Sequence, residues 1–184
     1  PAMEVVRSGG RGFVKLDVLH REILDRLLPQ FDLEHLDDSG RAELNSVWHR
    51  LAAWPDSVAG LLRLKSRFTI CSLSNGNLGL LVDMAKSASL PWDCVLSAEV
   101  FSAYKPDPRV YLGAAGIFDA DPGEVMMVAA HHDDLAAARA CGLQTAYIER
   151  PLEFGVGHVK DVSPQLGNTL HAQDLLHLAD QLGC

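Results

Sequence analysis

The sequence predicts an α/β fold in which helices cover both faces of a parallel sheet. From Trp54 onward, short apolar strands alternate with helical segments of about ten residues, which is the pattern of strand–helix–strand units. The strands are apolar almost throughout, as parallel strands buried on both faces are. Before Trp54 the apolar residues recur at helical spacing without a convincing strand. We therefore expect a helical module at residues 1–53 and an α/β core at residues 54–184.

The composition is that of an ordinary globular domain and excludes several classes of protein. The 184 residues carry a net charge of −8, and 48% of them are hydrophobic. No apolar run approaches the roughly 18 residues of a membrane span, and no secretory signal opens the chain. The acidic balance disfavours non-specific binding of nucleic acid, which needs an excess of Lys and Arg. We expect neither a membrane nor a nucleic-acid partner.

The cysteines indicate a reducing, cytoplasmic setting. They lie far apart and form no C-x-x-C pair, so they need not form disulfides. The same spacing makes a zinc site improbable. The four residues are Cys71, Cys94, Cys141 and Cys184.

Two helices are expected in the N-terminal module. In the first, apolar residues recur over 18–28 until Pro29 stops the helix. Asp38 and Ser39 can cap the second, which carries Leu44, Val47, Trp48 and Leu51.

The core is expected to alternate helix and strand up to the C-terminus. Pro108 suits the first turn of a helix, and Gly142 suits the C-terminal end of another. The carboxyl ends of the strands are where such folds gather their chemistry. The expected helices are 58–64, 78–88, 108–118, 134–141 and 172–182, and the expected strands are 68–73, 94–97, 125–128 and 145–148.

Polar residues follow the first expected strand, at Ser74, Asn75, Gly76 and Asn77. Their hydroxyl and amide groups, with the first amides of the next helix, can donate hydrogen bonds to an anion. The same residue types are typical of an ordinary polar turn. Both interpretations stay open at this point.

Lys105 follows the second expected strand and precedes Pro106, which favours an extended backbone at the lysine. Its ammonium is then a semi-rigid cation able to hold a carboxylate or phosphate oxygen. The alternative is a solvated lysine before a helix. After the fourth strand, Arg150 places another cation near the same edge.

Two histidines and two acids, residues 131–134, follow the third expected strand and suggest a metal site. Neighbouring residues point in different directions, however, so all four cannot converge on one ion. The favoured alternative is that Asp133 or Asp134 caps the following helix.

Together these loops resemble the motifs of the haloacid dehalogenase superfamily, in particular its type II, (S)-2-haloacid dehalogenases. Leu73–Asn77 is similar to the second motif, Tyr104–Tyr111 to the third and Met127–Leu135 to the fourth. The resemblance covers nearly the whole chain. It implies a Rossmann-like parallel sheet core of the haloacid dehalogenase type with a partial α-helical cap, of which residues 1–53 would be the tail.

The resemblance also implies roles for individual residues. Lys105 would neutralise the nucleophilic carboxylate, and Asp134 would orient Lys105 or the hydrolytic water. Ser74 and Asn75 would hold the substrate carboxylate, and Tyr111 would line the site. The implied reaction is attack of an Asp carboxylate on the halogen-bearing C2 with inversion, followed by hydrolysis of the ester. This reaction needs no cofactor and no metal.

The sequence departs from the family at the nucleophile. That Asp follows the first core strand, upstream of the cap, and the sequence has no such segment. Asp17 and Asp56 are the acids early in the sequence that could serve as the nucleophile, but neither follows an apolar strand. Without the central strand, buried backbone groups would stay unpaired at roughly 1–3 kcal/mol each. We therefore expect an upstream segment or a second chain to supply that strand, and a single closed sheet would contradict this.

A second departure lies in the fourth motif. Ala129, Ala130 and His131 stand where the dehalogenases carry Ser and Asn. Family phosphatases carry a metal-binding Asp at the position of Ala130, so the magnesium site looks disabled. His131 could replace the Asn as a donor to the substrate, or reshape the pocket for a different one.

The sequence thus predicts a hydrolase that displaces halide from a short 2-haloalkanoic acid, which makes a small carboxylate the expected substrate. One alternative is a phosphatase of the same superfamily. Another is a non-catalytic or truncated member that binds a small anion or a partner chain. A homodimer is a further expected partner.

Overall fold

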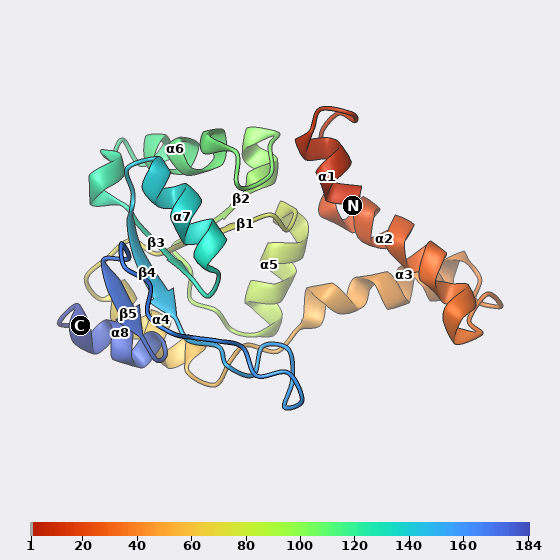
Figure 1. Cartoon of the computed structure of the whole chain (residues 1–184). Coiled ribbons are helices and arrows are strands. Elements are labelled where there is room, and N and C mark those ends of the chain that lie inside the picture. The colour runs from red at the N-terminus through yellow and green to blue at the C-terminus, as the bar shows by residue number, and fades with distance from the viewer. Residues whose placement is uncertain (1) are drawn as a thin grey trace. The chain divides into compact units, whose positions relative to one another are not determined.

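The computed structural model describes residues 2–184, and Figure 1 labels the helices and strands. The chain divides into two compact units. The first contains the chain up to Ala53 together with Cys71–Tyr104, and the second contains Trp54–Ile70 together with Lys105–Cys184. Because the chain passes between the units three times, neighbouring motifs of the sequence fall in different units.

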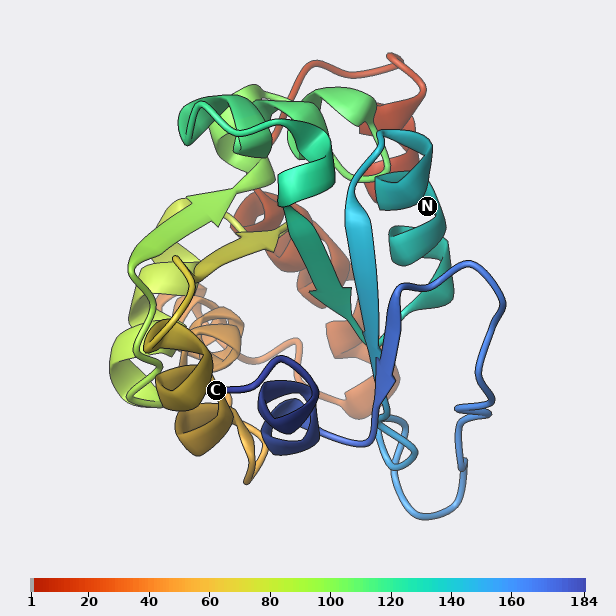
Figure 2. The same cartoon turned by 90° about the vertical axis from the view of Figure 1, so that its left-hand side faces the viewer.

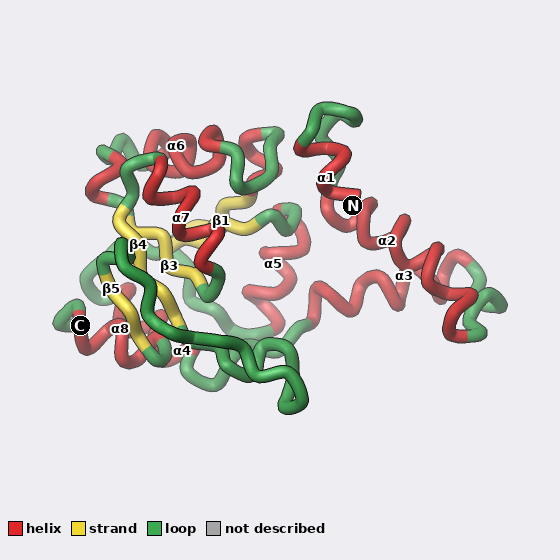
Figure 3. The backbone as a smooth tube through the Cα atoms, viewed as in Figure 1, coloured by secondary structure: helices red, strands yellow, loops and turns green. Residues whose placement is uncertain are grey.

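The first unit begins with helices, as predicted. Figure 3 shows that residues 2–53 contain helices and loops without a strand. Pro29 lies at the start of a 3-10 turn that follows the first long helix, so the α-helical geometry ends at Leu27. The elements are α1 (Ala2–Arg7), α2 (Leu16–Leu27), η1 (Leu28–Phe31), α3 (Asp38–Asn45) and η2 (Ser46–Arg50).

The N-cap of α3 is Asp37, so the predicted cap at Asp38 and Ser39 is wrong by one residue. The carboxylate of Asp37 accepts a hydrogen bond from the Gly40 N–H at 2.8 Å. Its extended backbone, with ψ of 177°, is the geometry that a capping residue adopts. Asp38 lies one step inside the helix and binds Arg21 instead.

The rest of the first unit is a parallel strand pair with one connecting helix. The elements are β1 (Cys71–Ser74), α5 (Leu78–Ser87), β2 (Cys94–Ser97) and η3 (Ala98–Phe101). In register, Cys71 lies opposite Cys94 and Ser74 opposite Ser97. The start of β1 is three residues later than predicted, because the Phe68 N–H still donates to the Leu64 carbonyl in the last turn of the preceding helix, α4 (Ser57–Lys65).

Polar side chains join the helical segment to α5 within the first unit. The Asn77 side chain donates to the Asp17 carboxylate at 2.8 Å and accepts from the Asp17 N–H at 3.1 Å. His49 lies between two acids, with Nε2 3.2 Å from Asp17 and Nδ1 2.8 Å from Asp83. α2 and η2 are therefore held to α5 by hydrogen bonds as well as by packing.

The second unit holds a three-stranded parallel sheet in the order β3-β4-β5 (Figure 2). β5 was not predicted, because its three residues are too few for a periodic signal and its last residue, Ala172, is the expected start of the last helix. That helix begins later, after Asp174, whose carboxylate accepts from the His177 N–H at 2.7 Å. The elements are α4 (Ser57–Lys65), α6 (Pro108–Ile117), η4 (Pro122–Glu124), β3 (Met126–Ala129), α7 (His132–Ala140), β4 (Gln144–Ile148), β5 (Leu170–Ala172) and α8 (Leu175–Gln181).

The core of the second unit lies between the sheet and the pair of helices α4 and α8. Gly60 lets these helices approach closely, since a Cβ there would lie only 2.4 Å from the Leu175 Cβ. Between α7 and β4, Gly142 follows the helix with φ of +86°, which confirms its predicted role as a helix terminator. The buried core residues are Leu64, Ala146, Ile148, Ala172, Leu178 and Ala179.

The strands form two separate sheets, β1-β2 and β3-β4-β5. Within residues 2–184, β1 and β3 are not hydrogen-bonded to each other, so the single closed sheet that would contradict a missing central strand is not found. The upstream segment stays a prediction. The division into residues 1–53 and 54–184 also stays a prediction, although one of the points at which the chain passes between units is Ala53. None of the helices of the described chain has the length and apolar character needed to cross a membrane.

Candidate functional site

Lys105, Tyr111 and Asp134 form a compact polar cluster in the second unit. The Lys105 ammonium donates to Asp134 Oδ2 at 2.6 Å, and the Tyr111 hydroxyl donates to Asp134 Oδ1 at 2.6 Å. The side chains of Lys105 and Asp134 are only 13% and 17% exposed, and Tyr111 is fully buried. Each oxygen of the carboxylate thus has its own donor in a largely dehydrated setting, where such bonds are strong.

Local sequence explains how two helix starts bring these groups together. The Asp107 carboxylate accepts from the Arg109 N–H at 2.9 Å, and Pro108 occupies the first helical position, so α6 begins directly after the Lys105 loop. Tyr111 lies in the first turn of α6. Asp134 lies in the first turn of α7, after β3. The predicted association of Lys105 with Asp134 is consistent with this geometry, and the role of Tyr111 in lining the site stays a prediction.

The expectation that Asp133 or Asp134 caps α7 is wrong. The N-cap is His131, which makes no capping hydrogen bond with its side chain. Asp134 is engaged by Lys105 and Tyr111, and Asp133 is exposed in the first turn, where a negative charge still interacts favourably with the helix dipole. Among residues 2–184, no three His, Cys, Asp or Glu side chains are grouped so that they could hold a metal ion.

His131 is directed to a residue that the sequence analysis did not single out. Its Nε2 lies 2.8 Å from Glu153 Oε1, and its side chain is 57% exposed. The other carboxylate oxygen of Glu153 accepts from Lys160 at 2.6 Å, and Lys160 also donates to the Ala130 carbonyl at 2.5 Å. No motif marks Glu153 or Lys160, because both lie in the irregular segment between β4 and β5.

Ser74 and Asn75 belong to the first unit, whereas the other four predicted site residues belong to the second. Ser74 Oγ accepts from the Gly76 N–H at 3.1 Å, which is a turn-type bond. The Asn75 side-chain amide contacts Met3 Sδ at 3.8 Å. The first amide of α5, at Leu78, donates to Glu99 at 2.7 Å. Part of the polar loop is therefore used internally, and its role in binding an anion stays a prediction.

Arg150 belongs to the packing of the second unit. Its guanidinium binds Asp56 at 2.7 Å and lies 5.0 Å from the centre of the Trp54 ring. Both members of the ion pair are 11% exposed. The second cation expected near the strand ends is thus already paired with Asp56.

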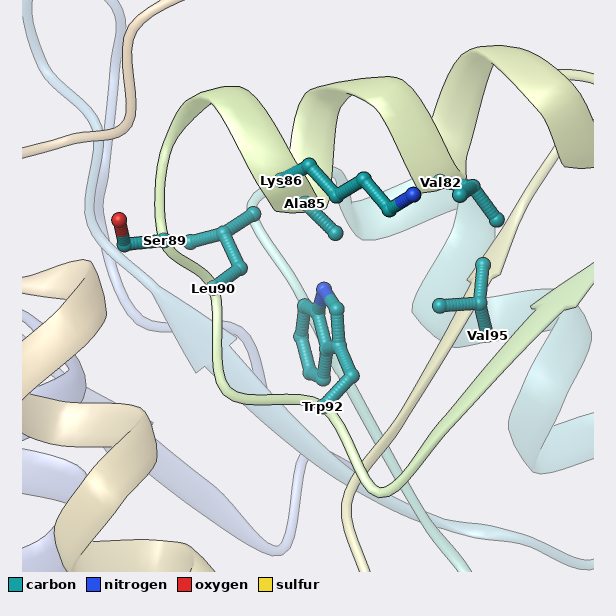
Figure 4. A pocket seen from close by; sticks show the side chains of 7 residues that line it. All are labelled: Val82, Ala85, Lys86, Ser89, Leu90, Trp92 and Val95. Atoms are coloured by element: carbon teal, nitrogen blue, oxygen red, sulfur yellow. The ribbon is translucent and has the colours of Figure 1, made fainter.

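A hollow of about 310 Å³ lies in the first unit, where Trp92 and Val95 face the last turns of α5 (Figure 4). Apolar side chains form most of its wall, and Lys86 extends along one side. None of the predicted site residues lines it. The lining residues are Val82, Ala85, Lys86, Ser89, Leu90, Trp92 and Val95.

Residues 3–142 match the family model described as haloacid dehalogenase-like hydrolase. This range contains both cluster-forming loops of the second unit, those of Lys105 and Asp134, as well as Ser74 and Asn75 of the first.

Curated relatives carry the same kind of name. The chain is 38% identical over 72% of its length to (S)-2-haloacid dehalogenase 1 of Pseudomonas sp. strain CBS-3. It is 32% identical over 74% of its length to (S)-2-haloacid dehalogenase 4A of Burkholderia cepacia. The match spans 59% of the first relative and 65% of the second, so the chain corresponds to somewhat less than two thirds of each.

Solved structures agree with these matches. A crystal structure of a defluorinating L-2-haloacid dehalogenase superposes with a TM-score of 0.96 at 45% identity, over 100% of this chain and 76% of that one. A second L-2-haloacid dehalogenase gives a TM-score of 0.95 at 48% identity, over 99% of this chain and 80% of that one.

Proposed function

Because the chain belongs to the haloacid dehalogenase-like hydrolase family, we propose that it is part of a 2-haloacid dehalogenase that displaces halide from a short 2-haloalkanoic acid. The observation that carries the proposal is the cluster of Lys105, Tyr111 and Asp134, which places a buried ammonium beside the carboxyl end of β3. The relatives named as (S)-2-haloacid dehalogenases support the reaction type.

The proposed reaction uses an aspartate carboxylate as the nucleophile. One carboxylate oxygen attacks C2 of the substrate, and the halide leaves with the electron pair of the carbon–halogen bond, which produces an ester with inversion at C2. Water then attacks the ester carbonyl carbon, so the 2-hydroxy acid is released, a proton is lost and the aspartate carboxylate is restored.

Lys105 acts in this scheme by neutralising negative charge. A nucleophilic carboxylate and a substrate carboxylate repel each other, and a buried ammonium lowers the cost of bringing them together. Asp134 keeps Lys105 in place through the 2.6 Å bond, and Tyr111 keeps Asp134 in place in turn. We assign binding of the substrate to Ser74, Asn75, Tyr111 and His131.

We place the nucleophile in a segment upstream of Pro1, which would also supply the central strand. The engagement of the two early acids supports this. The Asp17 carboxylate is bound by Asn77 and His49, and Asp56 is bound by Arg150 and the Leu175 N–H. Neither acid follows a strand, since Asp17 lies in the first turn of α2 and Asp56 is the N-cap of α4.

The test is halide release by the full-length protein from (S)-2-chloropropionate, with 2-fluoropropionate as a second substrate because one relative is named as defluorinating. We expect free chloride and inverted 2-hydroxypropionate. In H₂¹⁸O, the first turnover should place ¹⁸O in a protein carboxylate, because water attacks the ester on the enzyme side. Peptide mass spectrometry should then find the label upstream of Pro1, and label at Asp17 or Asp56 would contradict the assignment.

The alternatives give different outcomes in the same assays. A phosphatase would hydrolyse p-nitrophenyl phosphate only with magnesium present and would release no halide. A non-catalytic member would show neither reaction, even with the upstream segment present.

We also propose a homodimer in the cytoplasm. Free thiols at all four cysteines are compatible with a reducing compartment. Apolar side chains at least one third exposed along the helical segment could be covered by a second copy, which size-exclusion chromatography with light scattering would detect. They are Val5, Val18, Ile23, Leu27, Phe31, Leu44, Val47, Trp48 and Leu51.

A further inference from the structure

The irregular segment between β4 and β5, residues 149–169, reaches back to the loop that follows β3. Two of its charged side chains make the connection. Glu153 binds the His131 imidazole at 2.8 Å, and Lys160 binds the Ala130 carbonyl at 2.5 Å. Both the side chain at 131 and the backbone at 130 are therefore held by one distant segment, directly before the turn of α7 that carries Asp134.

The connection is more than a surface ion pair. The side chains of Lys160 and Glu153 are 14% and 25% exposed, and they bind each other at 2.6 Å. The Lys160 N–H also donates to the Pro151 carbonyl at 2.9 Å, which closes the segment on itself. A partly dehydrated pair whose ammonium has two acceptors keeps its geometry better than a solvated pair does.

The contact determines which nitrogen of His131 donates to Glu153 and therefore which tautomer the neutral ring adopts. Burial acts to raise the pKa of Glu153, but Lys160 and His131 outweigh burial and hold that pKa below its ordinary value. Glu153 is thus an ionised carboxylate, which can only accept hydrogen bonds, so His131 Nε2 must be the donor. Nδ1 is then the ring nitrogen left to meet a bound molecule, and the ring orientation is set from outside the site.

We propose that Glu153, braced by Lys160, is a positioning residue for the active site: it fixes the orientation and tautomer of His131 and thereby tunes how tightly the 2-haloacid binds. The inference rests on the proposed function, because His131 is assigned to substrate binding there. It goes beyond that function by giving the segment between β4 and β5 a part in substrate affinity.

The test uses four forms of the full-length protein: the parent, Glu153→Ala, Glu153→Gln and Asp133→Asn. Asp133 is the matched control, because it is an exposed acid two residues from His131 for which no side-chain partner is found in the described structure. The Gln variant removes the charge but keeps an oxygen that can accept from Nε2. Thermal unfolding first confirms that each variant is folded.

Two measurements then separate a positioning role from a purely structural one. Ring ¹⁵N NMR, at a pH where the ring is neutral and with His131→Gln used to assign the signals, should report the Nε2–H form of His131 in the parent and a tautomer mixture in Glu153→Ala. For (S)-2-chloropropionate, Glu153→Ala should raise KM about tenfold, the scale of losing one charge-assisted hydrogen bond, while kcat changes much less. Glu153→Gln should lie between, and Asp133→Asn should match the parent.

The proposal is overturned if the His131 ring shifts are the same in Glu153→Ala and the parent. It is also overturned if KM is unaffected, or if Asp133→Asn raises KM equally. Should Glu153→Ala not fold, the ring shifts and KM of Glu153→Gln decide in its place. Failure of the proposed function is distinct, since it would appear as a parent protein that releases no halide, whereas the ring shifts are measured without turnover.

Discussion

The second unit contains two acid–base pairs that are almost equally withdrawn from solvent but have different surroundings. Lys105 and Asp134 are 13% and 17% exposed, and Arg150 and Asp56 are each 11% exposed. Burial and charge therefore do not distinguish them. The distinction lies in what else each acid binds.

Asp56 is bound entirely by groups that hold the unit together. Besides Arg150 it accepts from the Leu175 N–H at 2.9 Å, so it joins the start of α4 to the start of α8 and to the end of β4. Burial acts to raise the pKa of Asp56, but the Leu175 and Arg150 hydrogen bonds outweigh burial and lower it. A structural pair also shifts the pKa of its acid, so a shifted pKa does not by itself identify an active site.

Asp134 instead binds two side chains that lie, with it, in the loops and first helical turns after strands. Lys105 follows the strand pair of the first unit, and Asp134 follows β3. The carboxyl ends of parallel strands are where α/β folds bind ligands. Because Arg150 also follows a strand, β4, we propose that the partners of each acid, and not its depth or its place after a strand, separate the two pairs.

The largest effect is expected for Lys105→Ala, which tests directly whether the Lys105–Asp134 pair is the functional one. We expect halide release by the full-length protein to fall by about 10³-fold or more, because a positioned charge at the reacting groups is lost. The chain should still fold, because Tyr111 still binds Asp134, although the uncompensated Asp134 charge lowers the free energy of unfolding. Steady-state kinetics and circular dichroism measure the two effects, with the exposed Lys86→Ala as control. Retained activity would remove Lys105 from the mechanism.

Asp56→Ala should mainly lower the stability of the protein, in contrast to Lys105→Ala, which should mainly lower its activity. Removing one member of a buried pair leaves the Arg150 charge uncompensated, and we expect a loss of about 3 kcal/mol in the free energy of unfolding. The control is Asp180→Ala, whose pair with Arg63 is 65% and 37% exposed and should contribute less than about 1 kcal/mol. Urea unfolding compares them, and equal losses would show that the Asp56 pair is an ordinary surface contact.

The lowered pKa of Asp56 predicts a pH dependence for the same pair. Its stabilising effect is present above the ordinary value of 3.8 and is lost as the pH falls through the lower folded-state value. Asp56→Asn should therefore lose less stability than the parent on acidification below about pH 4. Parallel acid-unfolding curves for the two proteins would contradict this.

Tyr111→Phe should sharpen the comparison within the site. It removes only the donor to Asp134 Oδ1 and keeps the ring, so we expect kcat to fall about tenfold, equivalent to one hydrogen bond to a charged group. Tyr104→Phe is the matched control, since its hydroxyl donates at 2.6 Å to the Val14 carbonyl in the first unit. Equal effects on kcat would argue against a specific role for Tyr111.

The smallest effect is expected at His49, in the first unit. Burial acts to lower the pKa of His49, but Asp83 and Asp17 outweigh burial and raise it above 6.5. The stabilisation is therefore complete below pH 6.5 and is lost as the pH rises through the folded-state value. Hydrogen exchange of α2 amides should show it as about 0.5–1 kcal/mol between pH 6 and 8. His49→Gln should abolish the difference, and the exposed His35→Gln should not.

Local patterns in the sequence were sufficient for most elements. The strands at 94–97, 125–128 and 145–148 lie within one residue of β2, β3 and β4, because a short apolar run between helices has few other structures available. β5 was not predicted because a strand of three residues is too short to show a periodic pattern of apolar residues. The cap of α7 was misassigned because whether an acid caps a helix or binds a distant lysine is decided by partners 20 to 30 residues away.

By itself, the sequence determined the fold class, the motifs and the family of this protein, since these depend on the order and spacing of residues along the chain. Only the tertiary structure decided which charges pair. It paired Lys105 with Asp134, Arg150 with Asp56 and Glu153 with His131. The physical reason is that ion pairs form between side chains that are close in space. In an irregular segment such as 149–169, the spacing of residues along the chain does not determine which distant residues its side chains contact.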